Sequence, residues 1–367
     1  MRFDRRLFIN FDWTLFLLLF LILFAGLVNL YSAGFAFTQD TSLCFKQCRW
    51  IVFGLFCMVL TFSVDYRIII RHGYFIYGIA IFLLLVVLFY GYMTHGSRRW
   101  ILFAGFSFQP SELMKLVIIL ILAKYFDENK LNRSLQLKDL LYPTLLTIIP
   151  FFLILQQPDL GTALIVLIIF VSMVLFIGIN WKSLSIACMT GMAMLPLSWF
   201  ILKDYQKERI LTLFAPEKDP LGSGYHIIQS MIAIGSGGWW GKGFLKGTQT
   251  HLRFLPEQQT DFVFSVFAEE WGFIGILILM ILFFSLIAWG LKICLHSKDY
   301  LGTLIAFGIT MLIAWSVLVN VGMVIGLLPV VGIPLPFMSY GGSSMVVLLI
   351  AMGFMLNISM RRFILHS

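Results

Sequence analysis

The sequence has little charge for its length. Of its 367 residues, 12% are charged and 60% are hydrophobic. A water-soluble fold of this size cannot bury so large an apolar fraction, so most of the chain must be surrounded by lipid. The net charge is +8, but the basic residues lie in short connectors between apolar segments. This pattern is typical of a membrane protein that contacts anionic lipid, and it does not indicate nucleic-acid binding.

Cysteines are also few, and no cysteine and histidine cluster has the spacing of a zinc site. Cys57, Cys188 and Cys294 lie in or near apolar segments, where they are expected to pack as small apolar side chains. Cys44 and Cys48 lie together in the first external connector. The sequence leaves open whether these two form a disulfide.

No internal repeat and no low-complexity tract is evident. Transporters built from inverted repeats often show two matching halves with interrupted helices. Here the connector of residues 203–261 is far longer than any other, which argues against an alternating-access carrier. The first apolar segment is too long for a signal peptide and lacks a following cleavage site, so we expect it to remain as an anchor.

The apolar segments predict membrane-spanning helices, each of which needs about 20 residues. We predict an all-α integral membrane protein with one domain (1–367) and a long extracytoplasmic loop (203–261) between the seventh and eighth spans. The second span is short and the fourth carries charges. The ten predicted spans are 13–33, 50–64, 72–93, 110–126, 140–156, 160–179, 182–202, 262–290, 301–328 and 343–359.

The basic residues of the short connectors indicate the orientation. Most lie at the termini and in alternate connectors, whereas the short connectors of the other side carry only Lys46, Arg49, Arg98 and Arg99. Basic connectors stay in the cytoplasm, so both termini are predicted to be cytoplasmic. In the long loop, apolar residues at helical spacing over 224–245 predict short helices on the outer leaflet.

Asp261 lies where the long loop meets the eighth predicted span. A carboxylate at this boundary touches water yet borders hydrocarbon, and partial desolvation raises its proton affinity, as a general base requires. The same residue type at a helix start also serves as an N-cap. Glu257, Glu269 and Glu270 are alternative acids nearby, the last two about two turns deeper.

Arg98 and Arg99 stand beside Trp100 on the predicted outer side. Two arginines in this setting fit a phosphate clamp, and they also fit long side chains that anchor to lipid headgroups. Gln109 follows and precedes a proline suited to the first turn of a helix.

Glu112 and Lys115 share one helical face within a predicted span, where paired charges often line a cavity but also form purely structural pairs. Asp159 suits an N-cap of the sixth span, and a cap at the outer surface can also line a site. The segment 327–344 is rich in proline and glycine, and such irregular backbone near a membrane is buried in protein or lines a wet cavity. Tyr340 with Gly341 and Gly342 either contacts a ligand there or forms a tight turn.

These segments resemble the SEDS family of membrane proteins (shape, elongation, division and sporulation). GSGYHIIQSMIAIGSGG, GTQTHLRFLPE and the short termini favour its elongation (RodA) branch over its division (FtsW) branch. The matching segments follow the family's order and, with the spans, cover essentially the whole chain: GSRRW, FQPSELMK, QPDLGTAL, DPLGSGYHIIQSMIAIGSGGWWGKGFLKGTQ, FLPEQQTDFVF, AEEWG and LLPVVGIPLPFMSYGGSS.

The resemblance implies a peptidoglycan glycosyltransferase that polymerises lipid II and releases undecaprenyl pyrophosphate. It implies that Asp261, in the family's TDF motif, is the catalytic general base. Many members have Arg-His where this chain has Gln258 and Gln259, so no essential role is assigned to these two positions. The residues expected to bind substrate are Arg98, Arg99, Trp100, Gln109, Glu112, Lys115, Asp159, Glu257, Thr260, Ser339, Tyr340, Gly341 and Gly342.

The implied partners are lipid II, the undecaprenyl-pyrophosphate-linked glycan, membrane lipid, and a class B penicillin-binding protein that supplies a transpeptidase. The implied location is the bacterial cytoplasmic (inner) membrane. No cofactor is assigned, and a divalent cation (Mg²⁺ or Mn²⁺) near Asp261 is left open. Two other functions fit the sequence: a flippase for the lipid-linked precursor, and a non-catalytic scaffold that activates a partner enzyme.

Overall fold

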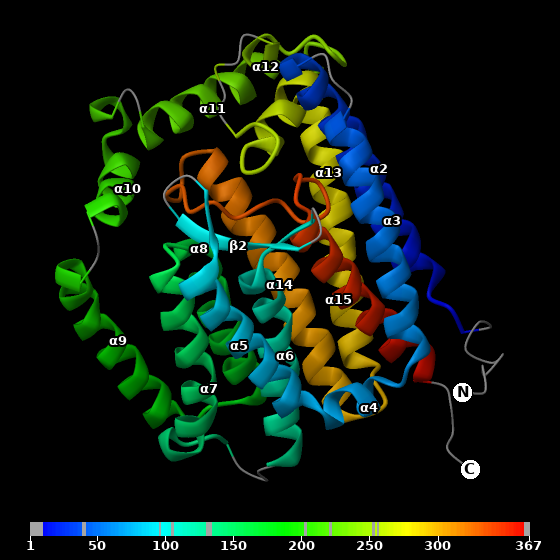
Figure 1. The fold of residues 1–367 in the computed structure, drawn as a ribbon, viewed down its shortest axis with the longest axis vertical. Helices are drawn as coiled ribbons and strands as arrows, with labels where there is room; N and C mark the ends of the chain where they lie inside the picture. The colour runs from blue at the N-terminus through cyan, green and yellow to red at the C-terminus, as the bar shows by residue number, and fades with distance from the viewer. Residues whose placement is uncertain are drawn as a thin grey trace.

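The computed structural model describes residues 10–38, 42–94, 97–103, 106–129, 134–201, 204–219, 222–251, 254 and 257–362. Long helices form the body of the molecule (Figure 1). Each coincides with a predicted span, although the second begins earlier and the eighth ends later than expected. They are α2 (Trp13–Thr38), α3 (Ser42–Ser63), α5 (Gly73–Tyr90), α6 (Pro110–Glu128), α7 (Leu137–Gln156), α8 (Leu160–Ile177), α9 (Trp181–Ile201), α13 (Val263–Leu295), α14 (Tyr300–Val324) and α15 (Gly342–Arg361).

Within the described residues, 8 of these helices are long and apolar enough to cross a membrane, so the chain is a multi-pass membrane protein. The other two long helices are α6 and α9, and the count of ten spans stays a prediction. Helix α6 carries Glu112 and Lys115 near its start, yet its side chains from Leu116 to Ala123 are all buried. Its surroundings are therefore protein rather than lipid, which relieves it of the need to be uniformly apolar.

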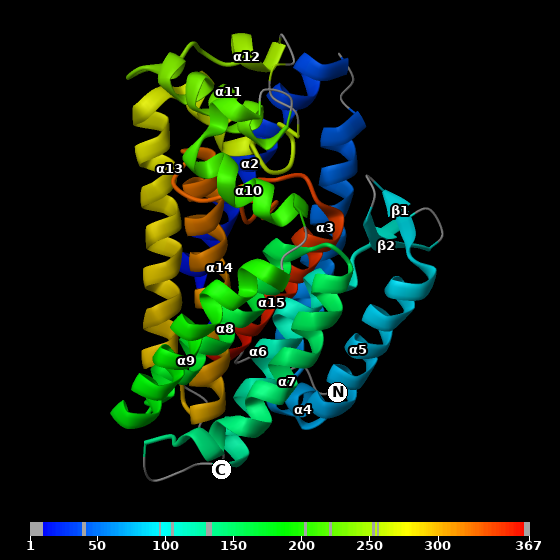
Figure 2. The ribbon, with the colours of Figure 1, turned by 90° about the vertical axis from the view of Figure 1, so that its left-hand side faces the viewer.

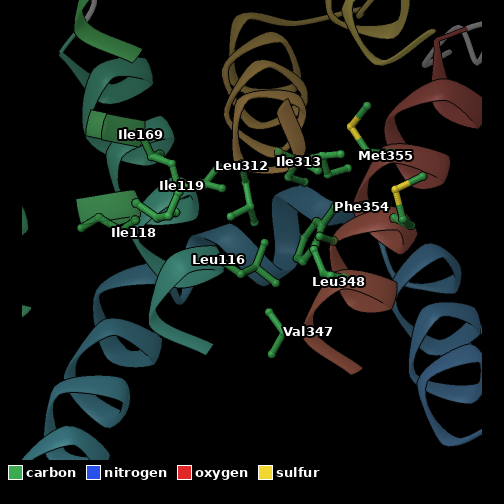
Figure 3. Packing of buried hydrophobic residues seen from close by; sticks show 14 of the residues in the cluster. Leu116, Ile118, Ile119, Ile169, Leu312, Ile313, Val347, Leu348, Phe354 and Met355 are labelled. Atoms are coloured by element: carbon green, nitrogen blue, oxygen red, sulfur yellow. The ribbon is translucent and has the colours of Figure 1, made fainter. Parts of the chain in front are cut away.

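The core lies where α6, α8, α14 and α15 meet (Figure 3). Leu116 and Ile119 of α6 face Leu312 of α14, and Phe354 of α15 belongs to the same cluster. Gly308 allows this approach, because a Cβ there would lie 2.5 Å from the Cγ2 atom of Ile119. Lipid tails are as apolar as leucine, so close packing of this kind, more than removal of water, stabilises the helix contacts.

One end of the bundle is tied together by Asp12, just before α2. Its carboxylate accepts hydrogen bonds from Trp289 Nε1 of α13 at 3.0 Å and from Ser359 Oγ of α15 at 2.7 Å. Nearby, Asp299 accepts from Tyr66 Oη of the short helix α4 (Tyr66–Arg71) at 2.5 Å. These contacts place the start of α2 and the end of α15 at the same end, as the predicted common side of the termini requires.

The long loop covers the opposite end (Figure 2). It contains short helices, as predicted: α10 (Asp204–Phe214), the 3₁₀ helix η1 (Pro216–Lys218), α11 (Ser223–Gly237) and α12 (Thr248–His251). Lys242 Nζ lies 2.6 Å from Glu269 Oε1, and Lys242 N donates to Glu269 O at 3.0 Å. Helix α13 is interrupted at Gly272, whose φ of 64° suits glycine.

Glu269 and Glu270 take part in these loop contacts. Glu269 is fully buried and also accepts a hydrogen bond from Thr248 Oγ1 at 3.0 Å, while Glu270 accepts one from Ser32 Oγ. Both acids therefore hold the loop and α2 against α13, and neither lines the cavity described below.

A small antiparallel sheet joins α5 to α6 and was not predicted from the sequence. Its strands are β1 (Tyr92–Thr94), β2 (Ser97–Phe103) and β3 (Phe106–Phe108), in the order β1-β2-β3. Tyr92 pairs with Trp100, and Ile101 pairs with Phe108. The fold is otherwise helical, so the all-α class is confirmed. Cys44 and Cys48 lie one turn apart in α3, and both are free thiols.

Candidate active site

A cavity of about 470 Å³ opens at the end of the bundle that carries the long loop. Segments far apart in the sequence form its wall: β2, the starts of α6 and α8, α10, the turn before α13, and the backbone before α15. The residues that line it are mostly polar or aromatic. They are Trp50, Arg99, Trp100, Ser107, Gln109, Glu112, Asp159, Thr162, Arg209, Glu257, Thr260, Asp261, Val331, Gly332, Pro334, Tyr340, Gly341, Gly342 and Ser344.

The turn before α13 holds Asp261 at this cavity. Thr260 N and Phe262 N both donate to Glu257 O, at 3.1 and 3.3 Å, which closes the turn. Asp261 O accepts from Asn320 Nδ2 of α14 at 2.9 Å. The backbone is thus fixed on its buried side, and the carboxyl group is left at the cavity.

The backbone at Gly332 packs closely against this carboxyl group. Gly332 has a φ of 72°, and a Cβ there would lie 3.3 Å from Asp261 Oδ2. Ser339 Oγ donates to Thr260 O at 2.5 Å, which fastens the same turn to the segment before α15. Only a glycine combines this backbone conformation with this space.

The surroundings raise the pKa of Asp261 from its ordinary value of 3.8 to about 7. Burial is the main cause, and the negative charge of Glu257 adds to it; Arg209 and Arg99 act in the opposite direction. A carboxyl group with this pKa exchanges protons near neutral pH, which is where a general base is most effective.

Arg99 is fixed by the connection between α7 and α8. Its Nε donates to Gln157 O at 3.1 Å and its Nη2 donates to Pro158 O. Arg99 lines the cavity together with Trp100, and its binding of a phosphate group stays a prediction. Arg98, in contrast, is exposed and does not line the cavity.

Asp159 caps α8, and it also lines the cavity and orients Gln109 there. Both roles considered from the sequence, an N-cap and a residue that lines a site, are therefore present. Its Oδ1 accepts from Thr162 N at 3.3 Å at the start of α8, while Oδ2 accepts from Gln109 Nε2 at 3.1 Å and from Ser111 Oγ at 3.2 Å. Gln109 N also donates to Ser343 Oγ at 3.0 Å. The side-chain amide of Gln109 is therefore held by Ser111 and Asp159, and its backbone N–H is held by Ser343 of α15.

Glu112 and Lys115 form a buried ion pair, with Lys115 Nζ 2.8 Å from Glu112 Oε1. Glu112 lines the cavity, whereas Lys115 lies one turn deeper and does not. The ammonium of Lys115 positions the Glu112 carboxylate and balances its charge, and substrate binding by Lys115 stays a prediction.

The segment before α15 makes the remaining wall. Tyr340 N donates to Gln259 O at 2.8 Å, and Gly341 N donates to Gln47 Oε1 at 3.3 Å. A Cβ at Gly342 would lie 2.2 Å from the ring of Trp50. Tyr340, Gly341 and Gly342 line the cavity, while Ser339 is buried behind them.

Several lining residues were not predicted, among them Trp50, Thr162 and Arg209. Arg209 is one of several charges in a polar stretch of the loop, so its sequence context gave no signal. Gln258 is buried, donates from Nε2 to Ala33 O at 3.2 Å and does not line the cavity.

This architecture defines a class: a multi-pass membrane protein with a polar cavity, lined by carboxylates and arginines, under a helical loop. The family model FTSW_RODA_SPOVE, described as cell cycle protein, matches residues 12–363. The chain belongs to this family, which is the SEDS family named above.

Known relatives align along nearly the whole chain. Peptidoglycan glycosyltransferase MrdB of Escherichia coli (strain K12) is 39% identical over 355 residues, covering 96% of this chain and 95% of the relative. Peptidoglycan glycosyltransferase RodA of Treponema pallidum (strain Nichols) is 32% identical over 430 residues, covering 96% and 98%.

Solved structures share the fold. A chain from a peptidoglycan synthase complex, studied for its coordination of polymerization and crosslinking, has a TM-score of 0.83 at 35% identity. The rod shape determining protein RodA of Thermus thermophilus has a TM-score of 0.73 at 31% identity. Each comparison covers 96% of this chain and 98% of the other.

Proposed function

We propose that this protein is a peptidoglycan glycosyltransferase that polymerises lipid II into glycan strands during cell elongation. Its family membership and its relatives named as such enzymes support the class of activity. The observation that carries the mechanism is the Asp261 carboxyl group at a polar cavity, with a pKa near neutrality.

In this mechanism one lipid II supplies a sugar hydroxyl as the acceptor, and the growing glycan on undecaprenyl pyrophosphate is the donor. The hydroxyl oxygen forms a bond to the anomeric carbon of the donor while its proton moves to Asp261. The bond from that carbon to the pyrophosphate oxygen breaks, and its electron pair leaves with the pyrophosphate. Proton removal by a positioned carboxylate contributes about 10² to 10⁴ in rate.

Other residues that line the cavity bind the sugar and phosphate groups. Arg99 provides positive charge, and the Gln109 amide, oriented by Asp159, provides hydrogen bonds to sugar substituents. The aromatic rings of Trp100 and Tyr340 give the apolar surfaces on which sugar rings pack. These roles extend the residue assignments made from the sequence.

A divalent cation fits this site only together with substrate. Among the described residues, no group of three or more His, Cys, Asp or Glu side chains is close enough to hold a metal ion. Glu257 and Asp261 share one turn, and Mg²⁺ commonly combines one or two carboxylates with substrate phosphates. Such an ion, when bound, would neutralise charge on the pyrophosphate.

We place the protein in the bacterial cytoplasmic membrane with both termini in the cytoplasm and the cavity outside. The proposed partner is a class B penicillin-binding protein, whose transpeptidase would crosslink the strands made here. The similarity to a chain of a peptidoglycan synthase complex supports such an assembly.

The test uses the purified protein and lipid II in detergent, where no membrane sidedness exists. A transferase makes glycan polymer under these conditions. A flippase makes no polymer but moves lipid II across the bilayer of liposomes. A scaffold does neither without its partner, so absence of product from the purified, folded chain contradicts the proposal.

A further inference from the structure

A second arginine reaches the cavity from the long loop. Arg209 belongs to α10, which packs against η1 and α11 at the loop end of the molecule (Figures 1 and 2). It lines the cavity together with Glu257, Thr260 and Asp261. Neither the basic connectors nor the segments that resemble the family pointed to this residue.

Two other cations near the cavity, Arg99 and Lys115, are bonded to groups of the protein itself. Arg99 has two of its guanidinium nitrogens bonded to the carbonyl groups of Gln157 and Pro158. Lys115 is paired with Glu112 below the cavity floor. Among the described residues, Arg99 and Arg209 are the cations that line the cavity, and they approach it from different elements, β2 and α10.

The charges that face Asp261 come from four elements. Glu257 of the same turn and Asp159 at the start of α8 raise its pKa, whereas Arg209 and Arg99 lower it, Arg209 more strongly. Arg209 also lowers the pKa of His226 in α11, which Glu257 and Asp219 raise and burial lowers. Helix α10 also contacts α11, and Arg209 lines the same cavity as the turn that carries Asp261.

Given the proposed function, we propose that Arg209 binds the pyrophosphate group of the lipid-linked donor and holds it beside Asp261. A guanidinium offers parallel N–H donors that match phosphate oxygens. During transfer, the electron pair of the broken carbon–oxygen bond stays on the pyrophosphate, and Arg209 stabilises that growing negative charge. The proton of the acceptor hydroxyl goes to Asp261. Arg209 in α10 therefore acts on the leaving pyrophosphate, and Asp261 in the turn before α13 acts on the attacking hydroxyl.

A binding measurement tests this role without relying on turnover. Undecaprenyl pyrophosphate is titrated into the purified protein in detergent, with undecaprenol as a probe that lacks phosphate. Arg209→Ala should weaken binding of the pyrophosphate about 10- to 100-fold, the range expected for a charge-assisted contact. Binding of undecaprenol should not change. Arg209→Lys, which keeps the charge but not the paired donors, should fall between.

Lys207→Ala is the matched control. Lys207 lies on the same helix, 4.0 Å from Asp204, and does not line the cavity. This variant should bind undecaprenyl pyrophosphate like the wild type. Equal weakening in Lys207→Ala and Arg209→Ala would indicate a general charge effect and overturn the inference.

The pH dependence of polymerisation gives a second readout. Because Arg209 favours the ionised form of Asp261, Arg209→Ala should move the acid limb of the rate profile to higher pH, and Arg99→Ala should move it less. A purely structural role would not shift this limb. Wild-type pyrophosphate binding and a wild-type limb in Arg209→Ala would refute the inference while leaving polymerisation by the wild type intact.

Discussion

The rate of polymerisation should depend on pH in the neutral range, because the pKa of Asp261 is about 7. The general base acts in its ionised form. With that pKa, about a tenth of the carboxyl groups are ionised at pH 6 and about nine tenths at pH 8, so kcat/KM should rise about 10-fold between them. At its ordinary value of 3.8, Asp261 would be ionised throughout and the profile would be flat.

The assay follows glycan product from lipid II at pH 5.5 to 8.5, with lipid II binding measured at each pH to separate affinity from catalysis. Glu257→Gln provides an internal check. Removal of this neighbouring negative charge should move the acid limb to lower pH, because Glu257 raises the pKa of Asp261. A flat profile in the wild type, or a limb that stays in place in Glu257→Gln, would refute the reasoning.

Three further predictions concern the support of the site. Gly332→Ala should lower activity about 10-fold or more through displacement of Asp261, since a Cβ would lie 3.3 Å from Oδ2; Gly178→Ala, with a similarly positive φ but open space around it, should share only the backbone strain. Lys115→Met leaves buried Glu112 without its partner and should lower stability by about 3–5 kcal/mol in detergent melts. Adding Glu112→Gln should recover most of that loss, and no recovery would argue against the pair. Finally, the unfolded carboxyl of Asp261 loses its proton near pH 4 and the folded one near pH 7, so stability should fall as pH rises through this window. Asp261→Asn should abolish that part of the decline, and an unchanged decline would show that other groups cause it.

The helices were predictable because each depends on a local property. A long apolar run has few alternatives in a bilayer, so all the predicted spans coincide with helices. The sheet of residues 92–108 was missed, because its short strands lie in a stretch whose glycines and arginines suggested an interfacial connector. Helix α6 also shows the limit of composition, since Glu112 and Lys115 near its start are accommodated by burial among other helices rather than by exposure.

The site was harder to predict, because periodicity describes one helix and not its neighbours. Arg99, Asp159 and Asp261 are far apart in the chain, and only the resemblance to a family grouped them before the fold brought them to one cavity. The sequence also does not show how far a side chain on a helix lies from the cavity. Lys115 pairs below the cavity, and Arg209 reaches it from a loop helix that looked like an ordinary polar connector.

The most direct test of the account compares purified wild type with Asp261→Asn in a lipid II polymerisation assay, with lipid II binding measured on the same samples. Asparagine keeps the size of the side chain but cannot accept the proton as a carboxylate does. We expect the variant to fold and bind lipid II like the wild type and to make no glycan strands. Polymer made by Asp261→Asn at the wild-type rate would contradict it.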